Sequence, residues 1–224
     1  MCAIDSSGGC DKNEELENYA YDTLKRLGGK NDLEAMVRIV NKAANLYGTY
    51  DEMLPALSNI FLGVYESNPL TILHASNADE CAAIGRESCA INKAEGTYFQ
   101  DTGFHEDFQD GDNQIFHFWA YLTTAASTDT SGLPANYLWG MNVAAVANVY
   151  HEIIWPEDPT GASWEDYGLS IVGIYIGMLV SMGAVPPEQL GNTIKNYVGT
   201  NSPGYPLTGM LTTVVPLPGN RTNP

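Results

Sequence analysis

The chain has 224 residues and is 44% hydrophobic, which allows a substantial core and excludes a globally disordered protein. Its formal net charge is −17, and its ten lysines and arginines form no cluster. Because a nucleic-acid binder needs a basic surface, the sequence predicts no nucleic-acid partner, and it disfavours binding to anionic lipid for the same reason.

The first half of the chain predicts amphipathic helices within residues 13–92. Apolar residues recur at helical spacing over residues 13–27, and Gly28 with Gly29 would end that helix. Further helices are expected to begin at three capping boxes, which pair Asn31 with Glu34, Thr49 with Glu52, and Asn77 with Glu80.

The second half predicts apolar helices within residues 112–198. They are rich in alanine, glycine and aromatic residues, and we expect them at residues 112–126, 134–154, 163–182 and 187–198. Within the third, short side chains recur at steps of three and four, at Asp166, Ser170, Gly173, Gly177, Ser181 and Ala184. Such a stripe lets another helix approach closely, and it would bring Asp166 toward that neighbour at the end of the bundle.

Residues 167–187 carry no charge, and this stretch is long enough to cross a membrane. Its glycines, its acidic flanks and the lack of a flanking lysine or arginine favour a buried helix of a soluble domain instead of a span. We therefore predict an all-α fold: one domain over residues 1–199, in which buried Ala/Gly-rich helices are surrounded by amphipathic ones. Residues 200–224 are proline-rich yet apolar, which predicts an extended arm lying in a groove of its own domain or of a neighbouring copy.

Four cysteines, Cys2, Cys10, Cys81 and Cys89, lie in polar segments as two close pairs. An even number in loop-like positions predicts two disulfides and an extracytoplasmic or secreted location, whereas four free thiols would indicate the cytosol. If Cys81 and Cys89 share one helix they are two turns apart, so each would pair with an N-terminal cysteine. The first twenty residues lack the apolar core of a signal peptide, so secretion requires that this chain is a mature form.

Polar residues on otherwise apolar helices form the candidate site. Asn113 and His117 are four residues apart and share a helix face, and His151, Glu152 and Asp166 are the other polar groups of this kind. His117, His151, Glu152 and Asp166 could supply a catalytic base with its orienting acid, and His117, His151 and Asp166 could bind a divalent metal. A satisfied polar network in the core is the other interpretation. The sequence contains no HExxH zinc motif and no nucleophile-elbow motif.

One family resemblance rests on these residues. An Asp-Asn-(x)3-His-x-Trp motif, an alanine-rich helix ending in His-Glu, and an Asp before a small-residue helix follow one another over about residues 109–185. This order resembles an uncharacterised bacterial helical module that is found free-standing and at the C-termini of RHS-repeat polymorphic proteins. The resemblance implies an all-α fold and a shared polar cluster at Asn113, His117, His151, Glu152 and Asp166, and it implies no activity. The chain departs from the module at Phe116, usually arginine there, and at Ser170, often asparagine.

Two functions from different classes follow from these patterns. The favoured one is an extracytoplasmic, acidic helical protein that acts as a structural, surface or assembly subunit. Residues 200–224 are its candidate segment for self-association, the alternative being an arm that packs on its own domain. The alternative is a hydrolase in which His117, His151, Glu152 and Asp166 converge in a cleft, with a divalent metal as the candidate cofactor. The solvent exposure of His117 and His151 separates the two functions. An open cleft lined by these histidines favours the hydrolase, and their full burial favours a core network.

Overall fold

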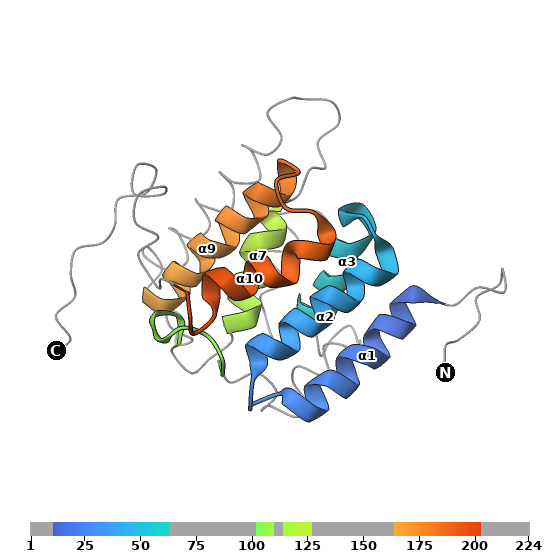
Figure 1. Cartoon of the computed structure of the whole chain (residues 1–224), viewed down its shortest axis with the longest axis horizontal. Coiled ribbons are helices and arrows are strands. Elements are labelled where there is room, and N and C mark those ends of the chain that lie inside the picture. The colour runs from blue at the N-terminus through green and yellow to red at the C-terminus, as the bar shows by residue number, and fades with distance from the viewer. Residues whose placement is uncertain (1–10, 63–101, 110–113, 127–163, 203–224) are drawn as a thin grey trace.

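The computed structural model describes residues 11–62, 102–109, 114–126 and 164–202. These residues are mostly helical and contain no strand (Figure 1), so the predicted all-α fold is confirmed for them. The elements in chain order are α1 (Lys12–Leu27), α2 (Asp32–Tyr47), α3 (Tyr50–Leu62), η1 (Glu106–Phe108), α7 (Gln114–Ala126), α9 (Trp164–Ser181), η3 (Pro187–Gln189) and α10 (Leu190–Val198). Among these helices, none has the length and apolar character needed to cross a membrane. The helices predicted from residue 77 and at residues 134–154, and the arm from residue 203 onward, lie outside the described residues.

The beginning and end of α2 follow from local capping. The Asn31 side chain accepts the N–H of Glu34 at 3.1 Å, as the capping box predicts. The box is only half formed, because the Glu34 carboxylate accepts hydrogen bonds from Arg38 and Lys195 instead of returning to the cap. Gly48 ends the helix in the left-handed region, with φ of 75°, a conformation that favours glycine.

The apolar faces predicted for the first three helices are buried. In α1 this face carries Leu16, Ala20 and Leu24. In α2 and α3 it includes Leu33, Met36, Val37, Val40, Leu57 and Phe61, all less than 5% exposed. Periodicity was therefore sufficient to assign the inner face of each helix.

The first three helices meet the second half of the fold at α7 and at α10. Helix α7 packs against α9 along one side and against α3 along another, and α10 packs against both α2 and α9 (Figure 1). The Phe61 and Trp119 rings, with centroids 4.9 Å apart, join α3 to α7 in the core. Tyr50 on α3 donates its hydroxyl to the Val185 carbonyl at 2.9 Å, and burial raises the pKa of that hydroxyl.

A buried aspartate joins the start of α2 to the segment before η1. Asp32 is fully buried, and its carboxylate accepts the Gly29 N–H at 2.7 Å, the Thr102 N–H at 3.1 Å and the Thr102 hydroxyl at 2.9 Å. Just beyond, the Phe104 and Gly199 backbones form an isolated antiparallel bridge. These bonds fix residues 102–109 between the start of α2 and the end of α10.

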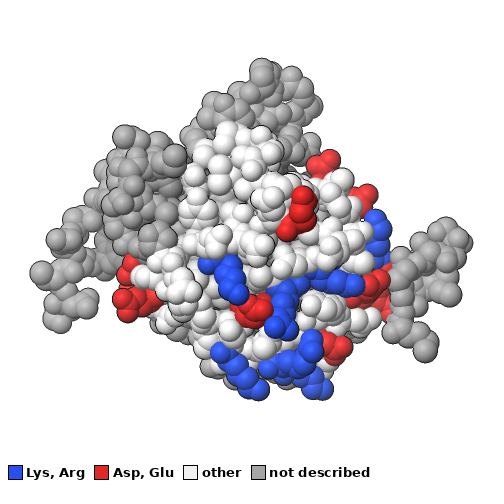
Figure 2. All heavy atoms as spheres, in the orientation of Figure 1, with Lys and Arg blue, Asp and Glu red and all other residues white. Residues whose placement is uncertain are grey.

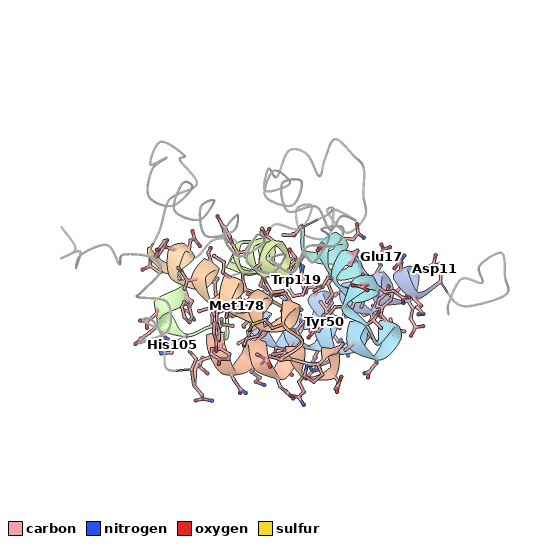
Figure 3. The ribbon with its side chains drawn as sticks, turned by 90° about the horizontal axis from the view of Figure 1, so that it is seen from above. Asp11, Glu17, Tyr50, His105, Trp119 and Met178 are labelled. Atoms are coloured by element: carbon pink, nitrogen blue, oxygen red, sulfur yellow. The ribbon has the colours of Figure 1, made fainter. Side chains whose placement is uncertain are left out.

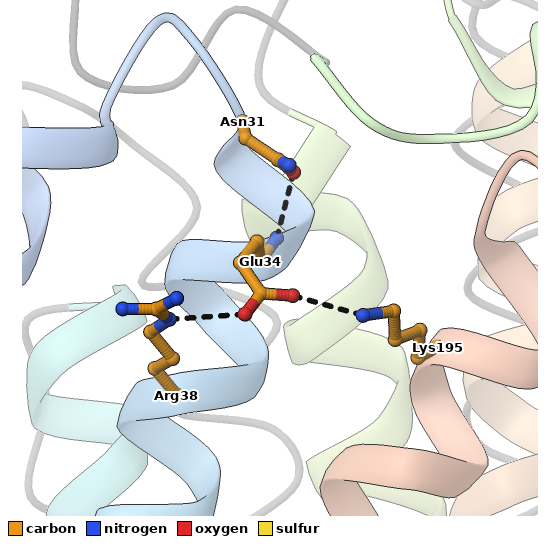
Figure 4. A network of polar contacts seen from close by, with 4 residues as sticks. All are labelled: Asn31, Glu34, Arg38 and Lys195. Carbon is orange, nitrogen blue, oxygen red and sulfur yellow. Dashed lines mark hydrogen bonds and ion pairs between the residues drawn. The ribbon is translucent and has the colours of Figure 1, made fainter.

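Figure 2 shows lysine and arginine side chains interleaved with acidic ones on one face of the molecule, which α1, α2 and α10 line in Figure 1. Glu34 is the centre of one such group (Figure 4): its carboxylate accepts from Arg38 at 3.0 Å and from Lys195 at 2.9 Å. The Lys195 bond, followed by the Arg38 bond, lowers the pKa of Glu34. The network therefore ties α10 to α2 across the surface.

Replacing Lys195 by methionine should weaken this tie slightly. The Lys195 and Glu34 side chains are 55% and 25% exposed, so solvent screens the pair and the free energy of unfolding should fall by only ~0.5 kcal/mol at pH 7. Because the pKa of Glu34 is lowered in the folded state, the stabilisation is present above the unfolded pKa and is lost as the pH falls through the folded one. Urea unfolding of K195M and the parent should therefore differ at pH 7 and coincide near pH 3. The exposed Lys30 supplies the control K30M, and an equal loss in that variant would contradict a specific role for Lys195.

Candidate functional site

The candidate site depends on two apolar helices, α7 and α9. In α7, every side chain of residues 118–126 is buried, and in α9 residues 166–174 are buried. Neither helix has a basic residue in its last turn, and α9 has Glu165 and Asp166 in its first. Both are therefore core helices whose few polar groups need a specific explanation.

The predicted stripe of short side chains on α9 lies against α7. A Cβ atom added at Gly173 would come within 2.7 Å of the Phe118 carbonyl oxygen, and one added at Gly177 would come within 2.8 Å of the Ala125 Cβ and would overlap the Leu122 carbonyl. The prediction that another helix approaches this stripe closely is confirmed at Gly173 and Gly177. It is wrong at Ala184, which is exposed because α9 ends at Ser181. Because residue numbers rise in the same direction along both helices, α7 and α9 are parallel.

Asp166 lies at the end of the fold where α7 and α9 both begin. Its side chain is 1% exposed, and Ser170, one turn later, is fully buried. Gly173 lies beside Phe118 and Gly177 beside Leu122. One turn earlier along both helices, the same register places Ser170 level with the first turn of α7. A second step places Asp166 at the Gln114 end of α7. The helix register thus puts Asp166 at the end of α7 whose first turn includes His117 by sequence.

This location also explains why a carboxylate is tolerated there. Parallel helices present their positive dipole ends side by side, and a negative group in the first turn of a helix interacts favourably with that end. Asp166 is in the first turn of α9 and beside the start of α7, so it is near two such ends. An ionised Asp166 side chain would therefore be stabilised by the N-terminal ends of these helices.

The other predicted site residues lie wholly or partly outside what the structure describes. His117 lies on α7, on the helix face that also carries the buried Tyr121 and Thr124, but its side chain is outside the described set. Asn113, His151 and Glu152 lie outside the described residues altogether, as do all four cysteines. Convergence of His117, His151, Glu152 and Asp166, metal binding by His117, His151 and Asp166, and the two disulfides all stay predictions. Within the described parts, no group of three His, Cys, Asp or Glu side chains could hold a metal ion.

His105 is a histidine that sequence reasoning did not select, and it lies at the η1 end of the molecule in Figure 3. Its Nδ1 accepts the Asp107 N–H at 3.2 Å and lies 3.5 Å from an Asp107 carboxylate oxygen. The His105 N–H donates to the Val198 carbonyl at 2.8 Å. His105 therefore caps η1 and joins it to α10, a role for which no periodic signal exists in the sequence.

Comparison with known proteins adds no relative: no family model, curated protein or solved structure matches the chain. What the described residues define is an all-α protein with a parallel, glycine-packed helix pair in its core and a buried carboxylate where both helices begin.

Proposed function

We propose that this protein is an extracytoplasmic structural or assembly subunit, and that its polar helix residues stabilise the core instead of performing chemistry. The observation that carries this proposal is the burial of Asp166 to 1% exposure in the first turn of α9, where a helix N-terminus would stabilise a negative charge. A hydrolytic acid or metal ligand must be reached by water and substrate, and this carboxylate is closed off.

The location and the mode of association follow from the sequence. Four cysteines in polar segments support an oxidising compartment, and a net charge of −17 supports solubility in it. The apolar segment at residues 200–224 supports self-association, with the arm of one copy lying on another. Light scattering of the parent and of a chain ending at residue 208 tests the arm, because the shorter chain should lose the parent's association state.

A hydrolase is the second candidate, and one observation favours it. The Ser170 hydroxyl is buried, and among the described residues it has no hydrogen-bond partner. A buried hydroxyl without a partner costs ~1–3 kcal/mol, a cost that proteins retain more readily at a site than in a purely structural core. Ser170 is one turn from Asp166, so the same end of the α7–α9 pair would hold this site.

Metal analysis of the native protein separates the two candidates. The structural proposal expects no stoichiometric metal in the parent, and it expects a loss of stability but no loss of metal in the double variant His117→Ala/His151→Ala. The control is His105→Ala, which removes a histidine that caps η1. Stoichiometric metal in the parent and in the control, absent from a double variant that keeps its helical spectrum, would overturn the structural proposal in favour of the hydrolase.

A further inference from the structure

Two tyrosine rings lie against each other where α9 and α10 pack together. Tyr175 is on α9 and Tyr197 is near the end of α10, and the two helices lie side by side (Figure 1). The ring centroids are 5.5 Å apart and the ring planes are inclined at 62°, which is an edge-to-face arrangement. Neither tyrosine belongs to the candidate site, which is at the other end of α9.

The two hydroxyl groups of this pair are hydrogen-bonded to each other. Burial, followed by the hydrogen bond with Tyr197, raises the pKa of the Tyr175 hydroxyl. A hydrogen bond that raises the pKa of a phenol is one in which that phenol donates, so the Tyr197 oxygen accepts it. In each ring the two Cε atoms are bonded to the carbon that carries the hydroxyl. Contact between the hydroxyl groups therefore also brings a Cε edge of each ring toward the other ring.

The backbone holds both residues in place while their side chains stay accessible. Tyr175 belongs to α9, which packs along its length against α7. Directly after Tyr197, the Val198 carbonyl accepts the His105 N–H at 2.8 Å, which fixes the end of α10. Both tyrosine side chains are only partly buried. An oxidant in the solvent can therefore reach them, and the rings have room for a small shift.

We propose that Tyr175 and Tyr197 form a site of oxidative crosslinking, at which a peroxide acting through a one-electron oxidant joins the two rings as dityrosine. Each hydroxyl loses one electron and one proton, which leaves two tyrosyl radicals. The radicals couple through a new bond between one Cε atom of each ring, and the hydrogen of each coupled Cε moves to the oxygen and restores the phenol. The pair loses two hydrogen atoms in total, and hydrogen peroxide takes up the two electrons and two protons to become two molecules of water.

Proximity selects this pair over a tyrosine that is merely exposed. Groups that a fold holds in contact react at effective concentrations far above those of proteins in solution. Tyr21 on α1 is 40% exposed, so an oxidant reaches it, but its ring lies beside the Lys25 ammonium and has no tyrosine ring in contact among the described residues. The bond between Tyr175 and Tyr197 lies within one chain, so the inference goes beyond the proposed function and does not depend on assembly.

Oxidation with a haem peroxidase and hydrogen peroxide tests the site. Dilute protein is treated, the monomer fraction is isolated, and its dityrosine is measured by fluorescence and mapped by mass spectrometry of the digested chain. The crosslinked Tyr175–Tyr197 peptide should be the main product. Dityrosine in the monomer fraction should fall on the order of tenfold in Tyr175→Phe and in Tyr197→Phe, because each variant keeps the ring and removes the hydroxyl that is oxidised. The matched control Tyr21→Phe should retain the yield of the parent, and circular dichroism checks that all three variants keep their helices.

Two results would overturn the proposal. One is an equal loss of monomer dityrosine in Y175F and Y21F. The other is an unchanged yield of the Tyr175–Tyr197 peptide when the parent is oxidised in concentrated urea, where the fold no longer holds the rings together. Neither result bears on the proposed assembly function, which the shortened chain tests separately.

Discussion

Replacing Gly177 by alanine should destabilise the protein by ~3 kcal/mol. The added Cβ would overlap the Leu122 carbonyl oxygen and lie 2.8 Å from the Ala125 Cβ and 3.0 Å from the Ala126 nitrogen. Two of these three neighbours are backbone atoms of a buried helix, so they cannot move aside as a flexible side chain would. Overpacking of this kind typically costs ~1–3 kcal/mol, and the rigid surroundings favour the upper end. Urea unfolding should show a lower midpoint with an unchanged slope.

Gly183 provides the matched control just beyond the end of the same helix. Its φ is 68°, and a Cβ added there would meet nothing within 4 Å. Asparagine tolerates this backbone conformation, so Gly183→Asn should change the free energy of unfolding by less than ~0.5 kcal/mol. If G177A and G183N unfold at the same urea concentration as the parent, α7 and α9 do not approach each other as closely as the structure has them.

The helices could be predicted from sequence because their signals are local. Apolar residues at helical spacing predicted which faces of α2 and α3 are buried, and the glycines after α1 and α2 predicted where these helices end. The close approach to α9 was also predictable, because Gly173 and Gly177 recur at helical spacing on one face. What the stripe could not specify is the partner, α7, or its parallel direction, since both depend on how the intervening chain returns.

Contacts between residues that are distant in sequence account for the features of the structure that the sequence did not predict. Glu34 was expected to complete a capping box, but Lys195, 161 residues away in sequence, binds its carboxylate instead. No sequence pattern singles out Asp32, which is buried with Thr102, 70 residues later, as the donor of two of its hydrogen bonds. His105 gave no periodic signal because its partners are a neighbouring N–H and the end of α10. For the candidate site, Asp166 could be selected from the sequence, whereas its position beside the start of α7 follows from the register of α7 against α9.

Replacing Asp166 by asparagine should lower the free energy of unfolding by ~2 kcal/mol. Asparagine keeps the size of the side chain and removes its charge, so the variant loses the interaction with the dipole ends of α7 and α9. Such an interaction is worth ~0.3–1 kcal/mol at an exposed site and up to ~2 kcal/mol where solvent screening is reduced, and the burial of Asp166 favours the upper end. The neighbouring Glu165 is less buried and is in the same first turn, so Glu165→Gln should cost less than ~1 kcal/mol and serves as the control.

The sign of the Asp166→Asn effect bears directly on function. Groups kept for chemistry are often unfavourable for the fold, so their removal tends to leave stability unchanged or to raise it. Groups kept for the core lower stability when they are removed. Urea and thermal unfolding of D166N should therefore show a clear loss, larger than that of E165Q, with the helical spectrum retained. An unfolding midpoint for D166N above that of the parent would contradict the structural role, and the buried end of the α7–α9 pair would then be the place to look for a reaction.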